Sequence, residues 1–111
     1  MHDDGLTPGQ RAILHDVLAP FAEKFDQVGL FGSRATGRAG PRSDVDLVIY
    51  GADDPRLVDQ LFTLFDESLL PMTVDVVDYD RIDHPPLKDH IDAVVRILFD
   101  RRDLIAPATP P

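Results

Sequence analysis

The sequence predicts a small α+β domain, α/β-like in the order of its elements, in which helices flank a mixed β-sheet. Three observations support this fold class. Apolar residues at helical spacing alternate with short apolar runs that are rich in β-branched residues. A helix of about 14 residues between the second and third runs is long enough for a parallel crossover. The first and second runs are joined by a glycine-rich loop.

The first expected helix begins at residue 8. Thr7 is suited to the N-cap, Pro8 to the first helical position, and Gln10 completes a capping box. The apolar face of this helix consists of residues at helical spacing: Leu14, Val17, Leu18, Phe21 and Phe25. Pro20 falls within this pattern, so we expect it to kink the helix or to divide it in two.

Two strands should follow this helix. Residues 28–31 form a short apolar run that is typical of a buried strand, and residues 44–50 form the second strand. The loop between them, residues 32–43, contains three glycines: Gly32, Gly37 and Gly40. We expect a single helical turn in this loop after Ser33.

A second helix and a third strand complete the crossover. Asp54 is suited to cap the helix, Pro55 to be its first residue, and Pro71 to end it. Residues 73–77 then read as the third strand.

The C-terminal part should contain one more helix and one more strand. Residues 86–93 look helical, and residues 94–99 either continue that helix or form a strand, which their β-branched side chains favour. We expect a single domain over residues 1–111, with flexible tails at residues 1–6 and 104–111.

Length and composition narrow the classes of function. A chain of 111 residues has the size of one domain, and 43% apolar residues suffice for a core. The absence of cysteine excludes disulfides and thiolate zinc sites. A formal net charge of −9 argues against direct nucleic-acid binding through bulk electrostatics. With no membrane-length apolar stretch and no signal peptide, the expected location is the cytoplasm.

Gly32 and Ser33 are the first candidate binding residues. Glycine lets backbone N–H groups approach an anion, and a serine at the start of a helical turn adds a hydroxyl group. The dipeptide alone is a weak signal, because it also fits an ordinary turn at the end of a strand. The loop is not a P-loop, because no Gly-Lys-Ser/Thr sequence follows. It is not a dinucleotide-binding fingerprint either, because Gly32, Gly37 and Gly40 do not fit the spacing Gly-x-Gly-x-x-Gly.

Asp44 and Asp46 are a more specific signal. They stand at the start of an otherwise apolar strand, and residues i and i+2 of a strand point to the same face about 7 Å apart. Two such carboxylates repel each other unless a cation lies between them, and burying the charge unpaired costs several kcal/mol. The pair therefore predicts a divalent metal site, and a nearby phosphate-binding turn indicates nucleotide chemistry.

Asp75 is the third candidate carboxylate. It is flanked by valines in the middle of the third strand, where an unpaired acid is out of place. If this strand neighbours that of Asp44 and Asp46, the three carboxylates converge on a site for two divalent ions, and Asp75 can also accept the proton of an attacking hydroxyl. Asp78 is the alternative third acid, although it reads better as a turn residue at the end of the strand.

The glycine loop carries a local basic cluster of Arg34, Arg38 and Arg42. Guanidinium groups here could meet a triphosphate, and Arg34 is the preferred candidate because it follows Ser33 directly. Solvated arginines that balance nearby acids are the alternative. The four histidines lack metal-ligand spacing and are expected to be surface or hydrogen-bonded residues, and the two tyrosines are expected to be packing residues.

Taken together, Gly32-Ser33, ten further residues, Asp44-Val45-Asp46 and a later strand aspartate resemble the signature of the DNA polymerase β-like nucleotidyltransferase superfamily. Residues 31–37 and 43–47 look like its minimal nucleotidyltransferase (MNT) branch, and the resemblance spans roughly residues 10–100. It implies the nucleotidyltransferase fold and Mg²⁺-dependent transfer of a nucleoside monophosphate from a nucleoside triphosphate such as ATP.

By position, the resemblance makes Asp44, Asp46 and Asp75 the catalytic metal ligands, holding two Mg²⁺ ions, and Gly32 and Ser33 the triphosphate contacts. It also implies a helical HEPN-like partner protein. In many such pairs the MNT protein is an antitoxin that adenylylates its toxin partner. Two alternatives stay open: a catalytic subunit that modifies a small molecule once a helical subunit joins it, and a binding module that neutralises a partner by contact.

Overall fold

The order of strands in the sheet is β3–β2–β1–β4. The computed structural model describes residues 4–105. The strands are β1 (Gln27–Phe31), β2 (Val45–Tyr50), β3 (Val74–Asp78) and β4 (Arg96–Asp100). The α-helices are α1 (Pro8–Leu18), α2 (Leu57–Asp66), α3 (Pro85–Val94) and α4 (Arg101–Ile105), and the 3₁₀ helices are η1 (Ala19–Lys24), η2 (Gly32–Arg34) and η3 (Tyr79–Arg81).

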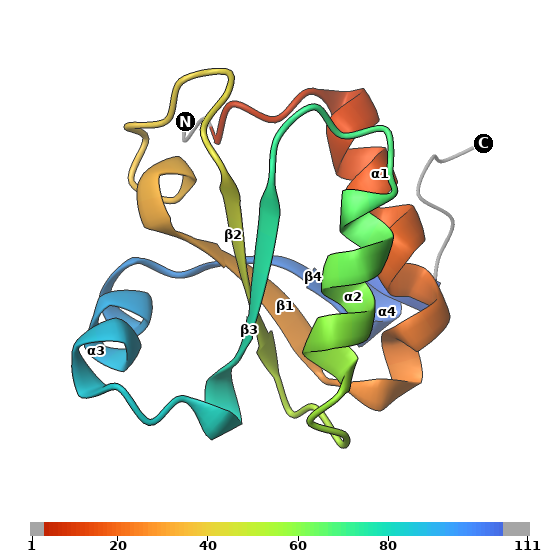
Figure 1. Cartoon of the computed structure of the whole chain (residues 1–111), viewed down its shortest axis with the longest axis vertical. Helices are drawn as coiled ribbons and strands as arrows, with labels where there is room; N and C mark the ends of the chain where they lie inside the picture. The colour runs from red at the N-terminus through yellow and green to blue at the C-terminus, as the bar shows by residue number, and fades with distance from the viewer. Residues whose placement is uncertain (1–3, 106–111) are drawn as a thin grey trace.

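The sheet is mixed, as the sequence predicts. β1 pairs antiparallel with both β2 and β4, whereas β2 and β3 are parallel. The glycine loop joins the antiparallel pair β1–β2, and α2 makes the crossover between the parallel strands (Figure 1). The predicted fold class, a small mixed sheet with flanking helices, is therefore confirmed.

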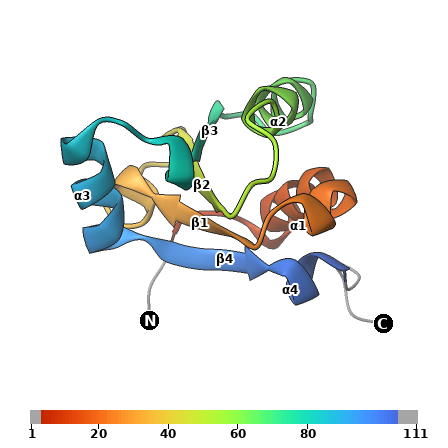
Figure 2. The same ribbon diagram turned by 90° about the horizontal axis from the view of Figure 1, so that it is seen from below.

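Helices lie on both sides of the sheet, and the two sides differ. α1, α2 and α4 lie on one side and α3 lies on the other, which Figures 1 and 2 show from two directions. The main core fills the first side, where Val45, Leu47 and Ile49 of β2 are all buried. On the opposite side a smaller cluster joins Phe31, Val48 and partly buried residues to Ile91 of α3, so this helix covers part of that face.

The start of α1 forms as its sequence predicts. The Thr7 hydroxyl accepts a hydrogen bond from the Gln10 backbone N–H at 3.0 Å, and the Gln10 side chain accepts one from the Thr7 N–H at 3.0 Å. Pro20 does divide the helical segment, because α1 ends at Leu18 and the chain continues as the 3₁₀ helix η1. A proline ring and its missing N–H are incompatible with an uninterrupted α-helix here.

The second helix is shorter than its sequence pattern indicates. α2 begins at Leu57, because Asp54 caps a turn and accepts a hydrogen bond from the Arg56 N–H rather than opening the helix itself. It ends at Asp66, and the residues up to Pro71 form a turn and an irregular segment. The third helix and the last strand are present. The strand interpretation is confirmed for residues 96–99 but is wrong for Val94, which is the last residue of α3.

Two expected tail segments are ordered in part. Asp4 accepts hydrogen bonds through both its backbone carbonyl and its carboxylate, so residues 4–6 are anchored rather than frayed. Leu104 lies in α4 and is 2% exposed within the main core, so the C-terminal tail expectation is wrong for residues 104 and 105. Its other residues, and residues 1–3, lie outside the described range.

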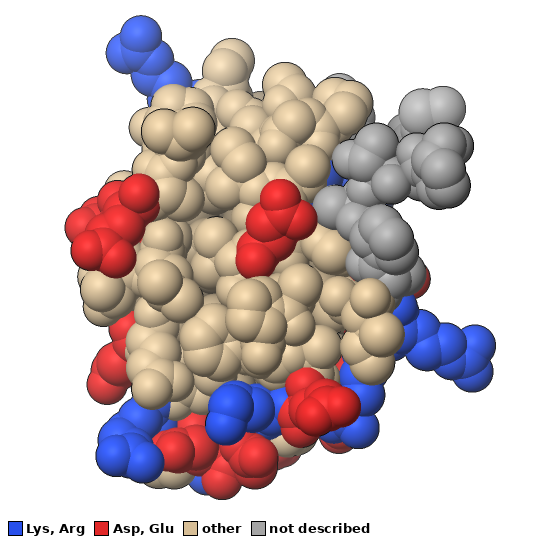
Figure 3. Space-filling view, turned by 90° about the vertical axis from the view of Figure 1, so that its right-hand side faces the viewer, with Lys and Arg blue, Asp and Glu red and all other residues tan. Residues whose placement is uncertain are grey.

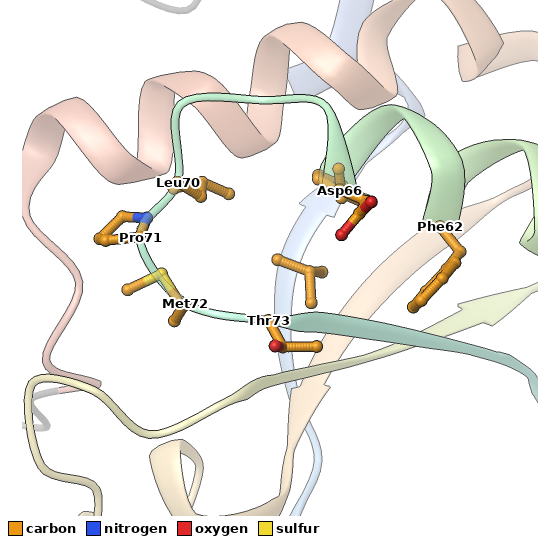
Figure 4. A pocket seen from close by; sticks show the side chains of 8 residues that line it. Phe62, Asp66, Leu70, Pro71, Met72 and Thr73 are labelled. Carbon is orange, nitrogen blue, oxygen red and sulfur yellow. The ribbon is translucent and has the colours of Figure 1, made fainter.

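The side of the sheet that carries α1 and α2 has a largely uncharged surface. Figure 3 shows this side, with charged side chains gathered mainly at its lower edge. Between the end of α2 and the start of β3 it holds a pocket of about 190 Å³, which is lined by Phe62, Asp66, Met72 and neighbouring residues (Figure 4). In the part of the chain that the structure describes, no helix combines the length and apolarity needed to cross a bilayer.

Candidate active site

The Gly32-Ser33 turn begins directly where β1 ends. Gly32 has φ of 73°, a left-handed backbone conformation that glycine adopts without steric cost. The turn continues as the 3₁₀ helix η2, in which the Ala35 N–H donates to the Gly32 carbonyl at 3.1 Å. The helical turn expected after Ser33 is therefore present. Ser33 is partly exposed, and its hydroxyl makes no hydrogen bond to any residue from 4 to 105.

Asp46 lies against this turn. Phe31 and Asp46 are cross-strand partners at the end of the β1–β2 ladder, which brings the Asp46 side chain beside the next residue, Gly32. A Cβ atom at Gly32 would overlap Oδ2 of Asp46 and would lie 3.2 Å from its Cγ. Gly32 is thus favoured by its backbone conformation, and any side chain there would also displace the Asp46 carboxylate.

Asp75 is brought to Asp46 by the parallel pairing of the two strands. The register places Asp46 of β2 opposite Asp75 of β3, so both side chains lie on the face that α3 partly covers. Asp44 lies at the end of the glycine loop, one residue before β2, and is exposed. The structure therefore brings Asp46 and Asp75 together beside the Gly32 turn, while Asp44 lies near enough for its charge to act on Asp46.

The three carboxylates affect one another's charge. Burial raises the pKa of Asp46 above its ordinary value, and the charges of Asp75 and then Asp44 raise it further. Within residues 4–105, no hydrogen bond or ion pair engages any of the three carboxylates. The folded chain therefore holds Asp46 where its negative charge is unfavourable on balance.

A hard divalent cation fits this donor set by chemistry. Carboxylate oxygens are the ligands that Mg²⁺ prefers, and a cation would offset the repulsion that raises the pKa of Asp46. The described residues contain no group of three or more His, Asp or Glu side chains already gathered closely enough to hold a metal ion. Asp44 is the member of the trio whose position depends on a loop rather than on a strand.

Arg34 is fully buried, which differs from an exposed side chain that waits for a triphosphate. Its Nε and Nη2 donate to the Ser43 carbonyl at 3.1 and 2.8 Å, and Nη2 also donates to the Pro41 carbonyl at 3.3 Å. Its Nη1 donates to the Asp4 carbonyl at 2.9 Å. The phosphate contact expected of Arg34 stays a prediction, and the observed contacts of this side chain are all to the protein backbone.

Asp78 has the structural role that its position indicates. It is 7% exposed, pairs with Arg81, and accepts a hydrogen bond from the Asp80 N–H at 3.2 Å as the cap of η3. Its carboxylate is thus already engaged at the end of the strand. Asp75, which is exposed and opposite Asp46, is the better candidate for the third acid.

His90 is a residue near the site that sequence reasoning missed. It projects from α3, and its ring packs edge-on against Phe31 with the ring centroids 6.2 Å apart. Its positive charge acts to lower the pKa of Asp46, against the larger effects of burial and the two carboxylates. No local signal in the sequence marks it, because the relation depends on how α3 folds back over β1 and β2.

The tyrosines are packing residues, as expected. The rings of Tyr50 and Tyr79 lie 4.8 Å apart, and the Lys88 ammonium lies 4.7 Å from the centre of the Tyr79 ring. The Tyr79 hydroxyl donates to Asp92 at 2.7 Å, which raises the pKa of Tyr79 to about 12. These contacts join the end of β3 to α3 on the same face of the sheet as the carboxylates.

Comparison with protein families gives one match over most of the chain. The family model described as polymerase beta, nucleotidyltransferase, matches residues 16–104. This range includes every candidate site residue. None of the curated proteins matches the sequence.

Solved structures with the same fold include toxin–antitoxin complexes. A chain of a toxin–antitoxin crystallised with AMP-PNP is 20% identical, with a TM-score of 0.66 over 88% of this chain and 82% of that chain. Two mutants of the toxin–antitoxin MntA–HpeT are 17% and 21% identical, with TM-scores of 0.63 and 0.62. These matches cover 93% and 86% of this chain, and 84% and 79% of the other chains. At these identities the likeness shows the fold.

Proposed function

Because the chain belongs to the polymerase β nucleotidyltransferase family, we propose that it transfers AMP from ATP to a hydroxyl group of a partner protein. One observation carries the proposal. The carboxylate of Asp46 lies against the Gly32 turn and opposite Asp75, so a glycine turn suited to phosphate binding and an acidic pair lie together. That combination serves phosphoryl chemistry, in which positioning and charge neutralisation supply most of the catalysis.

In this proposal the residues have separate tasks. The Gly32 turn and the Ser33 hydroxyl bind the β- and γ-phosphates of ATP, and they place the α-phosphorus beside Asp46. The acceptor oxygen then forms a bond to the α-phosphorus while the bond to the pyrophosphate oxygen breaks. Asp75, which is exposed opposite Asp46, takes the proton of the acceptor hydroxyl.

We assign the metal to the carboxylates of Asp44, Asp46 and Asp75. The family resemblance implies two Mg²⁺ ions. When bound, they would neutralise phosphate charge and polarise the α-phosphate. The chain's own contribution is to hold the acidic groups in place before the metal arrives, at the cost that the raised pKa of Asp46 reflects. A domain that acted by contact alone would have no use for three neighbouring carboxylates that have no hydrogen-bond or ion-pair partner within residues 4–105.

The acceptor is proposed to be a protein that binds this chain, and the chain is proposed to be the antitoxin of an MNT/HEPN pair. Three structures with its fold are toxin–antitoxin complexes, one of them with AMP-PNP, an ATP analogue. The surface is compatible with a partner, since Phe62 of α2 and Leu69 are apolar and 45% and 91% exposed.

A labelling experiment separates this function from its two alternatives. The protein is incubated with Mg²⁺ and ATP labelled at the α-phosphate, with and without the protein encoded beside it. Label on the partner protein supports the proposed function. Label on a small molecule supports a two-component enzyme that is completed by a helical subunit. Complex formation without any label would leave a binding module that neutralises its partner by contact.

A further inference from the structure

Arg34 is a buried cation that is solvated by the protein backbone. Its four hydrogen bonds all end on main-chain carbonyls, those of Ser43, Pro41 and Asp4. None of the ion pairs in residues 4–105 includes it. An arginine side chain has five donors in a planar fork, so it can hold several carbonyls at once, which a lysine ammonium cannot do in the same geometry.

These contacts join the Gly32-Ser33 turn to the segment that precedes Asp44. Arg34 directly follows Ser33 in η2, and Ser43 directly precedes Asp44. The β1–β2 ladder ends at the pair Phe31–Asp46, so it does not extend to the loop. Among the described residues, the hydrogen bonds between η2 and residues 41–43 are made by the Arg34 side chain.

The same side chain anchors the N-terminal segment to the loop. The Asp4 carbonyl accepts from Arg34, while the Asp4 carboxylate accepts from the Leu6 N–H at 2.9 Å and from Arg11 at 2.8 Å. Residues from three places in the sequence therefore meet at one guanidinium. Removing the guanidinium would leave these partly buried carbonyls without their donor, which costs more where water cannot replace it.

We propose that Arg34 is a positioning residue that fixes Asp44 relative to the Gly32-Ser33 turn, and that it does not contact the phosphates. The importance of the Asp44 position for catalysis rests on the proposed function. The restraint that Arg34 places on the loop does not, because it is present in the protein without ligands. Residues 35–38 hydrogen-bond back to η2 by themselves, whereas Asp44 is exposed and lies outside the strands, and among the described residues it is Arg34 that hydrogen-bonds the preceding segment 41–43 to η2.

The restraint is tested first in the metal-free and nucleotide-free protein. Hydrogen–deuterium exchange is measured for the wild type, Arg34→Gln, Arg34→Lys and the control Arg42→Gln, which removes an exposed arginine from the same loop. Loss of bonds to a charged donor should raise exchange in residues 39–44 by about tenfold or more in Arg34→Gln. Arg34→Lys should give a smaller increase, and Arg42→Gln should leave the wild-type pattern.

The role in the reaction is tested by separating binding from turnover. For a positioning residue, Arg34→Gln should lower kcat by about 10²-fold, as a misplacement of about 1 Å does, and should leave the ATP affinity measured without divalent ions within about twofold of wild type. Arg34→Lys should restore part of kcat. If Arg34→Gln does not fold, Arg34→Lys is decisive, because it keeps the charge and loses the fork.

The outcomes distinguish the two proposals. Unchanged exchange in both Arg34 variants, or a tenfold loss of ATP affinity with kcat preserved, would overturn the positioning role. Arg34→Lys that matches wild type in both exchange and turnover would also overturn it. If the wild-type protein transfers no nucleotide, the proposed function fails, and the exchange measurement still decides whether Arg34 holds the loop.

Discussion

The carboxylate of Asp46 occupies the space that a side chain at Gly32 would need, so the Gly32-Ser33 turn and the Asp46–Asp75 pair lie side by side. The contact arises because Phe31 and Asp46 are paired at the end of the β1–β2 ladder and Gly32 turns away with φ of 73°. A side chain at residue 32 would therefore have to displace the Asp46 carboxylate. The spacing between Gly32 and Asp46 in the sequence places the two residues in this close contact.

Replacing this glycine should damage both stability and activity. Gly32→Ala places a Cβ in the left-handed region and against Asp46, so we expect the free energy of unfolding to fall by about 1–2 kcal/mol or more. Nucleotide transfer should be lost, because the carboxylate must move. Gly40→Ala is the matched control, since a Cβ there meets nothing within 4 Å. Chemical denaturation of both variants checks this, and equal stability in the two would contradict the steric fit.

The metal-free protein should gain stability when Asp46 is neutralised. Burial and the charges of Asp75 and Asp44 raise the pKa of Asp46 in the folded state, so its ionised form opposes folding. Stability should therefore fall as the pH rises through that raised folded pKa. With solvent screening, we expect Asp46→Asn to raise Tm at pH 7 by about 2–4 °C and to flatten this pH dependence.

The same variants test the metal. Mg²⁺ should raise the Tm of the wild type by mass action and should have little effect on Asp46→Asn. Asp83→Asn, which removes an exposed acid elsewhere, should keep the wild-type response. A stabilising response to Mg²⁺ that survives in Asp46→Asn would argue against this carboxylate as a ligand.

The third acid can be identified by comparing two strand aspartates. Asp75→Asn should abolish transfer and leave stability unchanged or slightly higher, because Asp75 is exposed and has no partner within residues 4–105. Asp78→Asn should cost about 1–3 kcal/mol of unfolding free energy, because it weakens the pair with Arg81 and the cap of η3. Denaturation and transfer assays on both variants check this, and the reverse pattern would make Asp78 the third acid.

His90 of α3 should lower the pKa of the Asp46 carboxyl group. Its positive charge lowers the pKa of Asp46, so His90→Gln should raise that pKa further. An NMR titration of the Asp46 side-chain carboxyl in the metal-free protein measures the change. A pKa of Asp46 that falls or stays constant would show that α3 places the imidazole too far from the carboxylates to act on them.

Sequence reasoning reached the parts of this molecule that depend on local rules. The capping box of Thr7 and Gln10, the break at Pro20 and the parallel placement of Asp46 and Asp75 all follow from residue type and spacing. Each of these features needs either a few neighbouring residues or the length of one crossover helix.

The features that escaped it depend on contacts between distant segments. Arg34 looks like its neighbouring loop arginines in the sequence, and its burial depends on carbonyls of residues 4, 41 and 43. His90 is near Asp46 because α3 folds back over the sheet. Leu104 is in the core because α4 continues β4 toward η1, although the residues after it read as a proline-rich tail.

The central claim, transfer of the nucleoside monophosphate by the Asp46 site, is tested most directly by the position of the label in ATP. The wild-type protein and Asp46→Asn are incubated with Mg²⁺, the candidate partner, and ATP labelled at either the α- or the γ-phosphate. The account predicts that the wild type transfers the α-label, releases the γ-label as pyrophosphate, and that Asp46→Asn transfers neither. Transfer of the γ-label, or full transfer of the α-label by Asp46→Asn, would contradict it.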